Sequence, residues 1–373
     1  MAPKPTISDV AARAGVSKGA VSFALNGKPG VSNGTRSRIL EAAGDLGFSP
    51  SHTARSLASS RTGALAMVLA RQPDLLRSDP FFPPFVAGVE SVIAPAGQAL
   101  LLRFVPDARA ERAAYTELAH GRADGVLISD LRTRDPRPAL MEELGLPAVT
   151  LNRPTGRSPF PAVCLDDTRG VRDAVDHLVR LGHSRIAHVA GPARYLHAAS
   201  RRREWTSVLS DAGLQPGQLV ETDFTAAGGA AATRTLLDRP DRPTAILYAN
   251  DLMAVAGMAV AHRRGLRIPA DLSVIGFDDA ELSAHLHPPL ATVRTDAYDW
   301  GRAAATALLE LLAGKEAPDV HLSPAEFIAR ESTARPPRAA RTAVTRTRKP
   351  TQEPALRTRA AGTTDAPEKE FHR

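Results

Sequence analysis

The sequence predicts an all-α head of three short helices, followed by an α/β core with parallel sheets arranged in two lobes. Residues 5–49 repeat apolar residues at helical spacing between residues that cap or break helices. Residues 63–335 alternate short apolar runs with amphipathic stretches, which is the pattern of repeated βαβ units. Roughly 270 residues of this pattern are more than one lobe needs, so we expect two lobes.

The first predicted helix begins after Thr6, which forms a capping-box-like start with Asp9 three residues later. Gly15 ends this helix and permits a tight turn. Its apolar residues recur at helical spacing, as expected for one buried face: Ile7, Val10, Ala11 and Ala14.

Two further helices complete the predicted head. Ser17 is placed to cap the second helix, whose apolar stripe is Val21, Ala24 and Leu25. Residues 26–30 (NGKPG) form a loop because they are turn-forming and helix-breaking residues. Ser32 caps the third helix and Gly47 ends it, with Ile39, Ala43 and Leu46 facing inward.

The core is predicted from its apolar runs, which we interpret as strands of parallel sheets with helices on both faces. Amphipathic stretches between them, such as 168–181, 228–237 and 253–264, are the predicted helices. The predicted strands are 64–69, 99–104, 125–128, 148–151, 162–165, 185–190, 245–249 and 273–277.

Two polar segments flank the core. Residues 50–62 form a linker with room for one short helix and with a single large apolar residue, Leu57. Residues 336–373 are rich in Pro, Thr, Ala and charge, and we expect them to be disordered. This basic tail is either a solvated segment without a role or a source of additional nonspecific affinity for DNA.

Composition and charge limit the classes of function. The 373 residues are 43% hydrophobic and 23% charged, as in a globular protein, and the single cysteine excludes a disulfide framework or a thiolate zinc cluster. We expect no membrane-spanning helix because no apolar run reaches 18 residues, and a cytoplasmic location because MAPKPTISDV contains no signal-peptide core. The net charge of +7 is uneven. Residues 1–63 carry eight basic and three acidic residues, and residues 336–373 carry nine and four, so a basic head precedes a mildly acidic body.

Ordered motifs along the chain closely resemble the lactose/galactose-repressor (LacI/GalR) family of transcription regulators. In the head they are residues 6–17 (TISDVAARAGVS), 21–26 (VSFALN), 31–32, 35–36, 39–43, 46–48 and 54–57 (ARSL). In the core they are residues 177–178, 181–187 (LGHSRIA), 249–251 (AND), 273–279 (SVIGFDD) and 288–293 (PPLATV). A single motif such as GFDD is weak, but the ordered set is specific and covers roughly 330 residues.

The resemblance implies a helix-turn-helix head at 5–49, a hinge helix within 50–62 and a periplasmic-binding-protein-like core at 63–335. The first lobe is expected at about 63–161 and 293–322, and the second at about 162–292 and 323–335. The resemblance also implies a homodimer that binds a palindromic operator in double-stranded DNA and responds to a small molecule.

In a helix-turn-helix the second helix enters the major groove and its first residues contact base edges. Lys18 can donate to guanine, whereas Ala20 offers only a methyl group and Gly19 no side chain. Phe23 stands where several relatives have Arg, so we expect sparse base readout. Short polar side chains near helix starts suit phosphate contacts as well as capping. The candidate DNA-binding residues of the head are Ser8, Ser17, Lys18, Gly19, Ala20, Ser22, Phe23, Asn26, Ser32 and Thr35.

The linker supplies a second set of candidate DNA contacts. In the family, the Leu matching Leu57 inserts into the minor groove at the operator centre and kinks the DNA. The alternative is that this Leu only packs on the hinge helix of the partner. The resemblance places Ala54 and Arg55 beside the wedge, with Arg55 near phosphates or the groove floor, and Ser56 near the central base pairs.

Ligands of open α/β sheets bind at the carboxyl ends of strands. The polar residues that directly follow predicted strands are Ser129, Asn152, Arg153, Asn250, Asp251, Asp278 and Asp279. Asn250 and Asp251 can instead be structural at a strand end. Of Asp278 and Asp279, we expect one helix cap and one ligand contact.

The resemblance adds effector-binding positions. It implies an effector-binding Arg at Arg201, an aromatic contact at Trp205 and a ligand-binding Asp at Asp278. Phe224 matches an aromatic residue that stacks on the effector. Phe82 is expected to face the cleft, whereas Phe81 and Phe85 are either cleft or core residues. The predicted effector-binding set is Phe82, Ser129, Asn152, Arg201, Trp205, Phe224, Asn250 and Asp278.

These residue types favour a polyhydroxylated ligand, because sugars offer hydroxyl pairs to Arg and Asp and a CH face to aromatic rings. A nucleobase would suit the same groups. We expect no enzymatic activity and no cofactor, since no phosphate loop, dinucleotide fingerprint, zinc-protease motif or nucleophile elbow occurs. We expect no metal site, since His285 and His287 lack a third ligand nearby. The predicted function is a sequence-specific DNA-binding regulator, a repressor controlled by a sugar-like effector. The alternatives are a regulator controlled by a protein corepressor, such as a phosphocarrier protein, and a sugar-binding protein with the same core fold.

Overall fold

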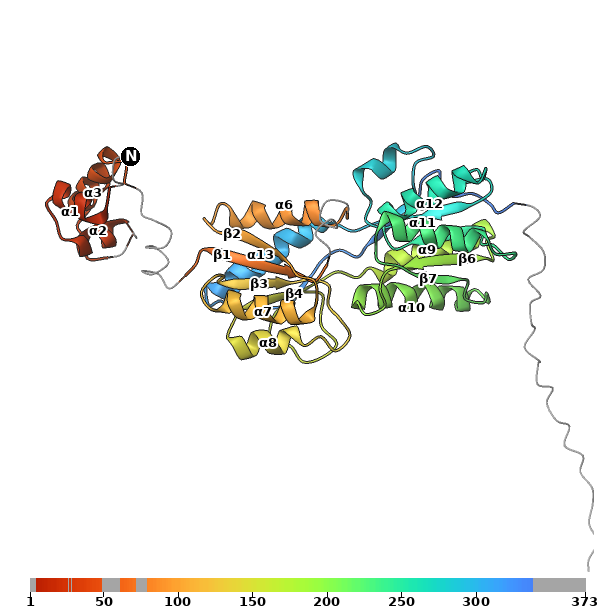
Figure 1. Cartoon of the computed structure of the whole chain (residues 1–373), viewed down its shortest axis with the longest axis horizontal. Helices are drawn as coiled ribbons and strands as arrows, with labels where there is room; N and C mark the ends of the chain where they lie inside the picture. Colours follow the sequence, from red (N-terminus) through yellow and green to blue (C-terminus); the bar gives the residue numbers. More distant parts are fainter. Residues whose placement is uncertain (1–4, 26, 28, 49–60, 72–78, 338–373) are drawn as a thin grey trace, which may run out of the picture. The chain divides into compact units, whose positions relative to one another are not determined.

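The computed structural model describes residues 5–25, 27, 29–48, 61–71 and 79–337 (Figure 1). The head contains α1 (Ile7–Ala14), α2 (Lys18–Leu25) and α3 (Asn33–Asp45), as predicted. The Thr6 amide and hydroxyl donate to the Asp9 carboxylate at 2.7 and 2.8 Å. Ser17 accepts from the Ala20 amide at 3.2 Å and Ser32 from the Thr35 amide at 3.3 Å, which confirms the three predicted helix starts.

The three helices of the head share one small core. Val10, Val21 and Ile39, one from each helix, are fully buried. Arg13 and Asp45 pair at 3.1 Å across α1 and α3, but both side chains are 60% exposed, so this pair contributes little stability. Apolar burial, rather than ion pairing, therefore holds the head together.

The first lobe of the core is built on a six-stranded sheet in the order β11-β5-β4-β3-β1-β2. All of its pairings are parallel. The strands are β1 (Ala64–Leu69), β2 (Ala99–Phe104), β3 (Gly125–Ile128), β4 (Ala148–Leu151), β5 (Ala162–Cys164) and β11 (Val320–His321).

Successive side chains of β1 point to opposite faces of this sheet, and helices cover both faces. Leu65, Met67 and Leu69 belong to the core under α6 (Phe82–Ile93) and α13 (Ala297–Leu312). Ala66 and Val68 face the opposite way, toward α7 (Ala108–Ala119) and α8 (Arg137–Leu144). Figure 1 shows one helix pair on each side of the sheet, as expected for βαβ units.

Two glycines allow α6 and α13 to pack closely. A Cβ added to Gly88 would overlap the carbonyl oxygen of Tyr298, and one added to Gly301 would overlap that of Phe85. A larger residue at either position would separate the two helices. This close packing matters for the site because α6 begins with Phe82 and α13 carries Trp300.

The second lobe repeats the arrangement on a four-stranded parallel sheet in the order β7-β6-β8-β9. Its strands are β6 (Ile186–Ala190), β7 (Leu219–Glu221), β8 (Ala245–Tyr248) and β9 (Ser273–Ile275). α9 (Thr168–Leu181) and α10 (Leu196–Asp211) pack together on one face, and α11 (Ala226–Leu237) and α12 (Asp251–Arg263) on the other. A 3₁₀ helix, η1 (Glu281–His285), follows β9.

The chain passes between the lobes three times, and two predicted boundaries need correction there. β5 lies in the first sheet because it pairs with β4, so residues 162–164 belong to the first lobe and not the second. β10 (Thr292–Arg294) pairs with β12 (Glu326–Ile328), and the Val293 carbonyl accepts from the Asp278 amide at 2.8 Å. Residues 293–294 therefore lie with the second lobe, and the passage to the first lobe follows them.

Candidate functional site

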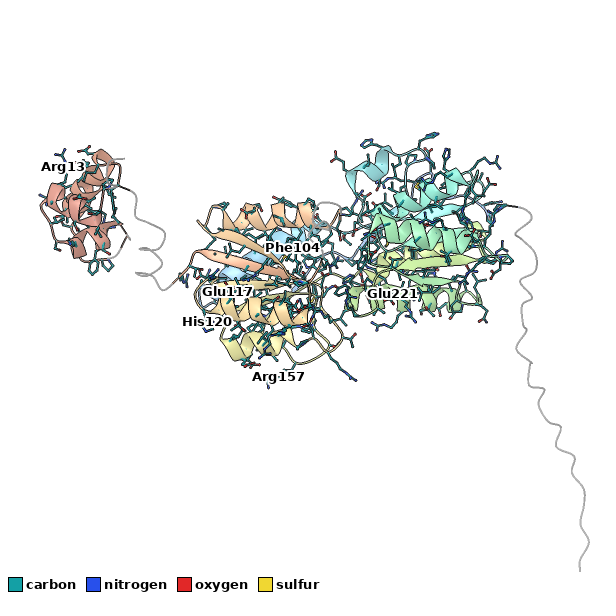
Figure 2. The ribbon with its side chains drawn as sticks, in the orientation of Figure 1. Arg13, Phe104, Glu117, His120, Arg157 and Glu221 are labelled. Carbon is teal, nitrogen blue, oxygen red and sulfur yellow. The ribbon has the colours of Figure 1, made fainter. Side chains whose placement is uncertain are left out.

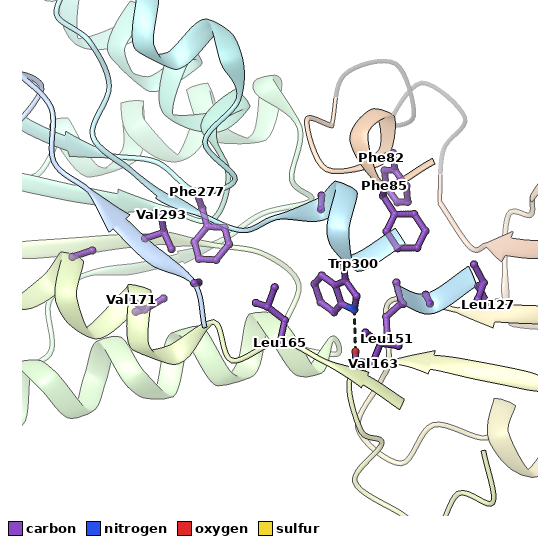
Figure 3. Close-up of a cluster of buried hydrophobic side chains, with 14 of the residues drawn as sticks. Phe82, Phe85, Leu127, Leu151, Val163, Leu165, Val171, Phe277, Val293 and Trp300 are labelled. Atoms are coloured by element: carbon purple, nitrogen blue, oxygen red, sulfur yellow. Dashed lines mark hydrogen bonds between the residues drawn. The ribbon is translucent and has the colours of Figure 1, made fainter. Parts of the chain in front are cut away.

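A cavity lies where the two lobes meet, at the carboxyl ends of strands from both sheets. Arg71 follows β1, Ser129 and Asp130 follow β3, and Asn152 follows β4. Asn250 and Asp278 come from the second lobe, after β8 and β9. Four residues labelled in Figure 3 also line the cavity: Phe82, Leu151, Leu165 and Trp300.

The first lobe supplies an aromatic wall. The Trp300 indole nitrogen donates to the Val163 carbonyl at 2.9 Å, the dashed line in Figure 3, which fixes the ring orientation. Phe81 meets Trp300 edge-to-face at 5.8 Å between ring centroids and Phe82 at 5.4 Å. Phe85 is fully buried beneath this wall and is not among the lining residues. Of the two open alternatives, Phe81 is thus a cavity residue and Phe85 a core residue.

The second lobe supplies Phe224, whose position is set by its surroundings. Its φ of 69° is left-handed, and its ring fills the space that a Cβ on Gly191 would need. The Asn250 amide donates to the Phe224 carbonyl at 3.0 Å, and its oxygen accepts from the Met253 amide at 2.8 Å to cap α12. Asn250 therefore lines the cavity mainly as a structural residue that holds Phe224.

Arg71 connects the two lobes, and this role was not predicted from the sequence. Its guanidinium donates to Asp130 at 2.6 Å and lies 3.6 Å from Asp79. Its guanidinium carbon lies 5.9 Å from the Phe82 ring centroid and 5.1 Å from those of both Tyr195 and Phe224. Because Tyr195 and Phe224 belong to the second lobe, these contacts join the lobes across the cavity.

Arg201 is the cation of the second lobe. Its Nε donates to Asp167 at 2.6 Å, and Nη1 donates to the Ala249 carbonyl at 3.3 Å. The guanidinium lies 3.5 Å over the Phe277 ring. These contacts hold the guanidinium on the cavity wall, as the predicted effector-binding role requires.

Three of the carboxylates in the lining have different electrostatic surroundings. Burial raises the pKa of Asp278 well above its usual range, repulsion from Asp79 raises it further, and Arg201 acts against both. Burial likewise raises the pKa of Asp79, although Arg71 lowers it. Burial also acts to raise the pKa of Asp130, but Arg71 and other nearby cations hold that pKa below its usual value.

Two polar side chains retain hydrogen-bonding capacity toward the cavity. The Ser129 hydroxyl is buried and has no hydrogen-bond partner among the described residues. Asn152, at a φ of 71°, accepts from the Leu165 amide at 2.7 Å through its side-chain oxygen. A ligand can therefore bind the Ser129 hydroxyl without breaking an existing hydrogen bond.

Seven of the eight predicted effector residues line the cavity, and the prediction for Trp205 is wrong. Trp205 is only 2% exposed, lies in the core with Val208 and Leu209, and has its ring 5.7 Å from that of His188. It shares a helix face with Arg201, but four residues of helix rise about 6 Å and carry it away from the cavity.

Three other strand-end candidates have structural roles. Asp251 accepts from Ser283 and Thr292, both at 2.6 Å, and burial raises its pKa to about 6. Arg153 pairs with Asp319 on the surface. Asp279 pairs with Arg294 at 2.7 Å and Arg330 at 2.5 Å, so it forms ion pairs where we expected a helix cap or a ligand contact.

Several lining residues were missed by the sequence analysis: Arg71, Asp79, Asp130, Asp167, His197, Thr295 and Trp300. The strand-end rule could have identified Arg71 and Asp130, because both follow predicted strands closely. Asp167 and Thr295 lie on the passages between lobes, where no periodic pattern marks them.

In the head, the candidate base-reading residues share an accessible stretch of α2. Lys18 and Gly19 are exposed and Phe23 is 44% exposed, although Phe23 is a large apolar side chain. The predicted contacts Ser8, Ala20, Ser22 and Thr35 are partly exposed, and Ser17 and Ser32 are exposed as well as capping. Figure 2 shows the head with its side chains drawn and Arg13 labelled. Asn26, Ala54, Arg55, Ser56 and Leu57 lie outside the described residues.

Comparison with known proteins gives consistent matches over both parts of the chain. Residues 6–51 match the model of bacterial regulatory proteins of the lacI family, and residues 175–333 match a periplasmic binding protein-like domain. The transcriptional regulator CelR of Thermobifida fusca is 33% identical over 323 residues, 86% of this chain and 95% of CelR. This chain belongs to the lacI family. The Escherichia coli repressor CytR is 32% identical over 334 residues, 88% of this chain and 96% of CytR.

Solved structures of lacI-family members show the same fold. The lac repressor dimer bound to operator and the anti-inducer ONPF superimposes with a TM-score of 0.79 at 30% identity, covering 89% of this chain and all of that one. The complex of CelR with cellobiose has a TM-score of 0.67 at 33% identity and covers 88% and 99%. The predicted helix-turn-helix head and parallel α/β core are confirmed, and this lacI-family chain is a DNA-binding transcriptional regulator. Within the described residues, no helix has the length and apolar character needed to cross a membrane.

Proposed function

We propose that this lacI-family regulator is a repressor whose operator affinity is controlled by a small molecule in the interlobe cavity. The main support for this proposal is that both lobes contribute side chains to one cavity. Arg71 and Phe82 lie on one side, and Arg201, Phe224 and Asp278 lie on the other. A ligand that contacts both lobes binds best to one lobe arrangement. It therefore shifts the protein toward that arrangement by its differential affinity.

The DNA-binding part of the proposal rests on the head and the linker. The exposed start of α2 carries Lys18 and Gly19 and is the part of a recognition helix that reaches base edges. A head with so few base-reading side chains binds weakly alone, so we propose a homodimer on a palindromic operator. We also propose that Leu57, outside the described residues, acts as the minor-groove wedge, with Ala54, Arg55 and Ser56 beside it.

The effector is proposed to be a sugar or sugar derivative. Arg201 and Asp278 offer charged hydrogen-bonding groups, and Phe224 and Trp300 offer apolar faces. Cellobiose in the CelR structure supports this ligand class for a protein of the same family.

Footprinting on the DNA upstream of the gene, with the full chain, tests the proposed mode of DNA binding. We expect two protected half-sites about a common centre, because the two-fold symmetry of a dimer requires a two-fold symmetric operator. Sedimentation of the complex should give two chains per operator. Full-affinity binding of one chain to a single half-site would contradict the proposal.

A further inference from the structure

The part of the cavity lining that the structure describes contains more carboxyl groups than guanidinium groups. Among the lining residues that the structure describes, the carboxylates are Asp79, Asp130, Asp167 and Asp278, and the guanidinium groups are Arg71 and Arg201. The remaining titratable group is His197. Burial and the neighbouring Arg201 lower the pKa of His197 to about 3, so its ring is neutral near pH 7. With all four carboxylates ionised, negative charges would outnumber positive charges four to two, but the raised pKa of Asp79 and of Asp278 favours the protonated form of both while no cation is bound.

Each of the two guanidinium groups already pairs with one of the carboxylates. Arg71 donates to Asp130, and Arg201 donates to Asp167, each at 2.6 Å. Asp79 accepts from the Phe81 amide at 3.1 Å and lies 3.6 Å from Arg71, which it shares with Asp130. Asp278 has no side-chain hydrogen bond or ion pair among the described residues, although Arg201, Arg71, Asp79 and Asp251 all act on it electrostatically. Asp79 and Asp278 are therefore the two carboxyl groups whose ionised form the described lining residues compensate least, and burial raises the pKa of both.

Two features independent of the carboxylates indicate that a ligand completes this site. The Ser129 hydroxyl is without a hydrogen-bond partner in the described part of the chain, and Ser129 is only 4% exposed. The rings of Phe224 and Trp300 line the cavity from opposite lobes. Aromatic faces attract cations, and buried carboxylates are costly unless a cation or hydrogen-bond donors compensate them.

We infer that the ligand of this cavity is a cation: a compact polyhydroxylated molecule with a protonated amine, of the amino-sugar class. Its ammonium group would lie at Asp79 and Asp278, a hydroxyl would bind Ser129, and its apolar face would contact the aromatic walls. A neutral sugar can exchange hydrogen bonds with the two carboxyl groups, but only a cation favours their ionised form. This inference rests on the proposed function, because it assigns a ligand class to the same effector cavity.

Matched ligand sets test the inference on the purified full chain. Thermal shift and calorimetry at pH 7.5 should compare D-glucosamine with N-acetyl-D-glucosamine and D-glucose, and D-galactosamine with its acetylated and hydroxyl counterparts. We expect an amine to bind at least about tenfold more tightly than its neutral counterparts. Asp278→Asn should remove that preference, whereas Asp173→Asn, the same change at an exposed position on α9, should retain it. Equal or tighter binding of a neutral counterpart would overturn the inference.

The ligand-free protein provides a second test that does not depend on the choice of compound. Removing an uncompensated carboxylate should stabilise the protein, so Asp278→Asn and Asp79→Asn should each raise Tm at pH 8. The gain should shrink at pH 5, because the native carboxyls with raised pKa take up protons there. If no compound of the panel binds, the Tm comparison of the ligand-free proteins decides. A higher Tm in either variant supports the inference, and a lower Tm in both at pH 8 overturns it.

Operator binding separates this inference from the proposed function. A neutral sugar that binds the cavity and changes the operator affinity of the wild-type chain would overturn the cationic ligand and support the proposed control. An ammonium compound that binds through Asp278 without changing operator affinity would support the inference and contradict the proposed control.

Discussion

We propose that Phe23 contributes to base readout by the recognition helix. Its ring is 44% exposed on α2 and lies against the loop at Gly30, where an added Cβ would come within 3.2 Å of the ring. A phenyl ring has no hydrogen-bond donor, so in the major groove it can favour only the methyl group of thymine. Phe23 would therefore give this head an apolar contact with DNA.

Exchanging Phe23 for Arg should change the base preference of the operator. We expect Phe23→Arg to replace a preference for thymine by one for guanine at one symmetric pair of positions, by about 1–3 kcal/mol. Binding selection on randomised operators measures the preference, with Phe23→Leu as the apolar control. An unchanged preference at every position in a folded Phe23→Arg variant would show that Phe23 contacts no base.

Leu57→Ala tests the proposed wedge. Losing the wedge removes the apolar contact that supports an unstacked central step, so operator affinity should fall on the order of tenfold, about 1.4 kcal/mol. Affinity for nonspecific DNA should change little, because it is electrostatic. Titration of both DNAs at one salt concentration gives the ratio. An equal loss on both would assign Leu57 to folding or to contact with the partner.

At the scale of single residues, local sequence pattern predicted the cavity where residues follow strands directly. Ser129, Asn152 and Asp278 were found in this way. Trp205 was misplaced because sharing a helix face with Arg201 does not fix depth along the helix axis. Asp167 was missed because its role comes from pairing with Arg201, a contact between residues 34 positions apart.

Among the elements, the interlobe loop (residues 130–135) joins the lobes through its backbone. The Leu196 amide donates to the Leu131 carbonyl at 2.8 Å and the Thr133 amide to the Arg194 carbonyl at 3.2 Å. Buried ion pairs hold the loop: Arg137 pairs with Asp135 at 2.6 Å and with Glu111 at 3.4 Å, and Arg132 pairs with Glu111 at 2.8 Å. The carboxylate of Glu111 on α7 thus supports the loop through its pairs with Arg132 and Arg137.

Neutralising Glu111 should loosen this connection. Glu111→Gln leaves the buried Arg137 with less compensating charge, so we expect a loss of stability of about 3 kcal/mol. Hydrogen exchange should rise in residues 130–135 and 194–196. Glu143→Gln is the matched control, since its pair with Arg112 is more than 60% exposed on both sides and should contribute about 1 kcal/mol or less. Unchanged exchange at both segments in Glu111→Gln would mean that the ion pairs do not support the interlobe contact.

The element scale also shows where sequence patterns stop being informative. The strands of the predicted set all recur in the structure, because four to six apolar residues mark a buried strand. β7, β10, β11 and β12 were not predicted, since each has only two or three residues and we assigned no apolar run to it. The misplaced lobe boundaries at β5 and β10 have a different origin, because strand pairing rather than sequence assigns these segments to a lobe.

For the whole molecule, His183 links pH to stability. Its ring nitrogens lie 2.8 Å from the Thr244 hydroxyl and 2.8 Å from the Ala334 carbonyl, so it holds the last described segment on the second lobe. Burial lowers the pKa of His183 to about 4. The unfolded chain therefore binds this proton more readily than the folded chain, and the stability from His183 is complete above about pH 6.5 and lost as pH falls toward 4.

His183→Gln should flatten the acid side of the stability profile. The lowered pKa corresponds to a loss on the order of 3 kcal/mol between pH 6.5 and 4 in the wild type, which a non-titrating Gln cannot show. Urea unfolding at several pH values measures it, with the exposed His120→Gln as control. An acid loss in His183→Gln as large as in the wild type would assign the pH dependence to other groups, such as His188, whose pKa is also about 4.

The central claim is that a ligand in the interlobe cavity controls operator affinity. Titration of the operator complex with the identified effector tests this claim most directly. Arg201→Ala and Asp278→Ala should bind operator without effector nearly as the wild type does, because both residues belong to the core and not to the head. Each should need at least about tenfold more effector for the same response, since each removes a buried polar contact to the ligand. Asp173→Asn should respond as the wild type does. The claim would be contradicted if both cavity variants respond at wild-type effector concentrations, or if either folded variant loses operator binding outright.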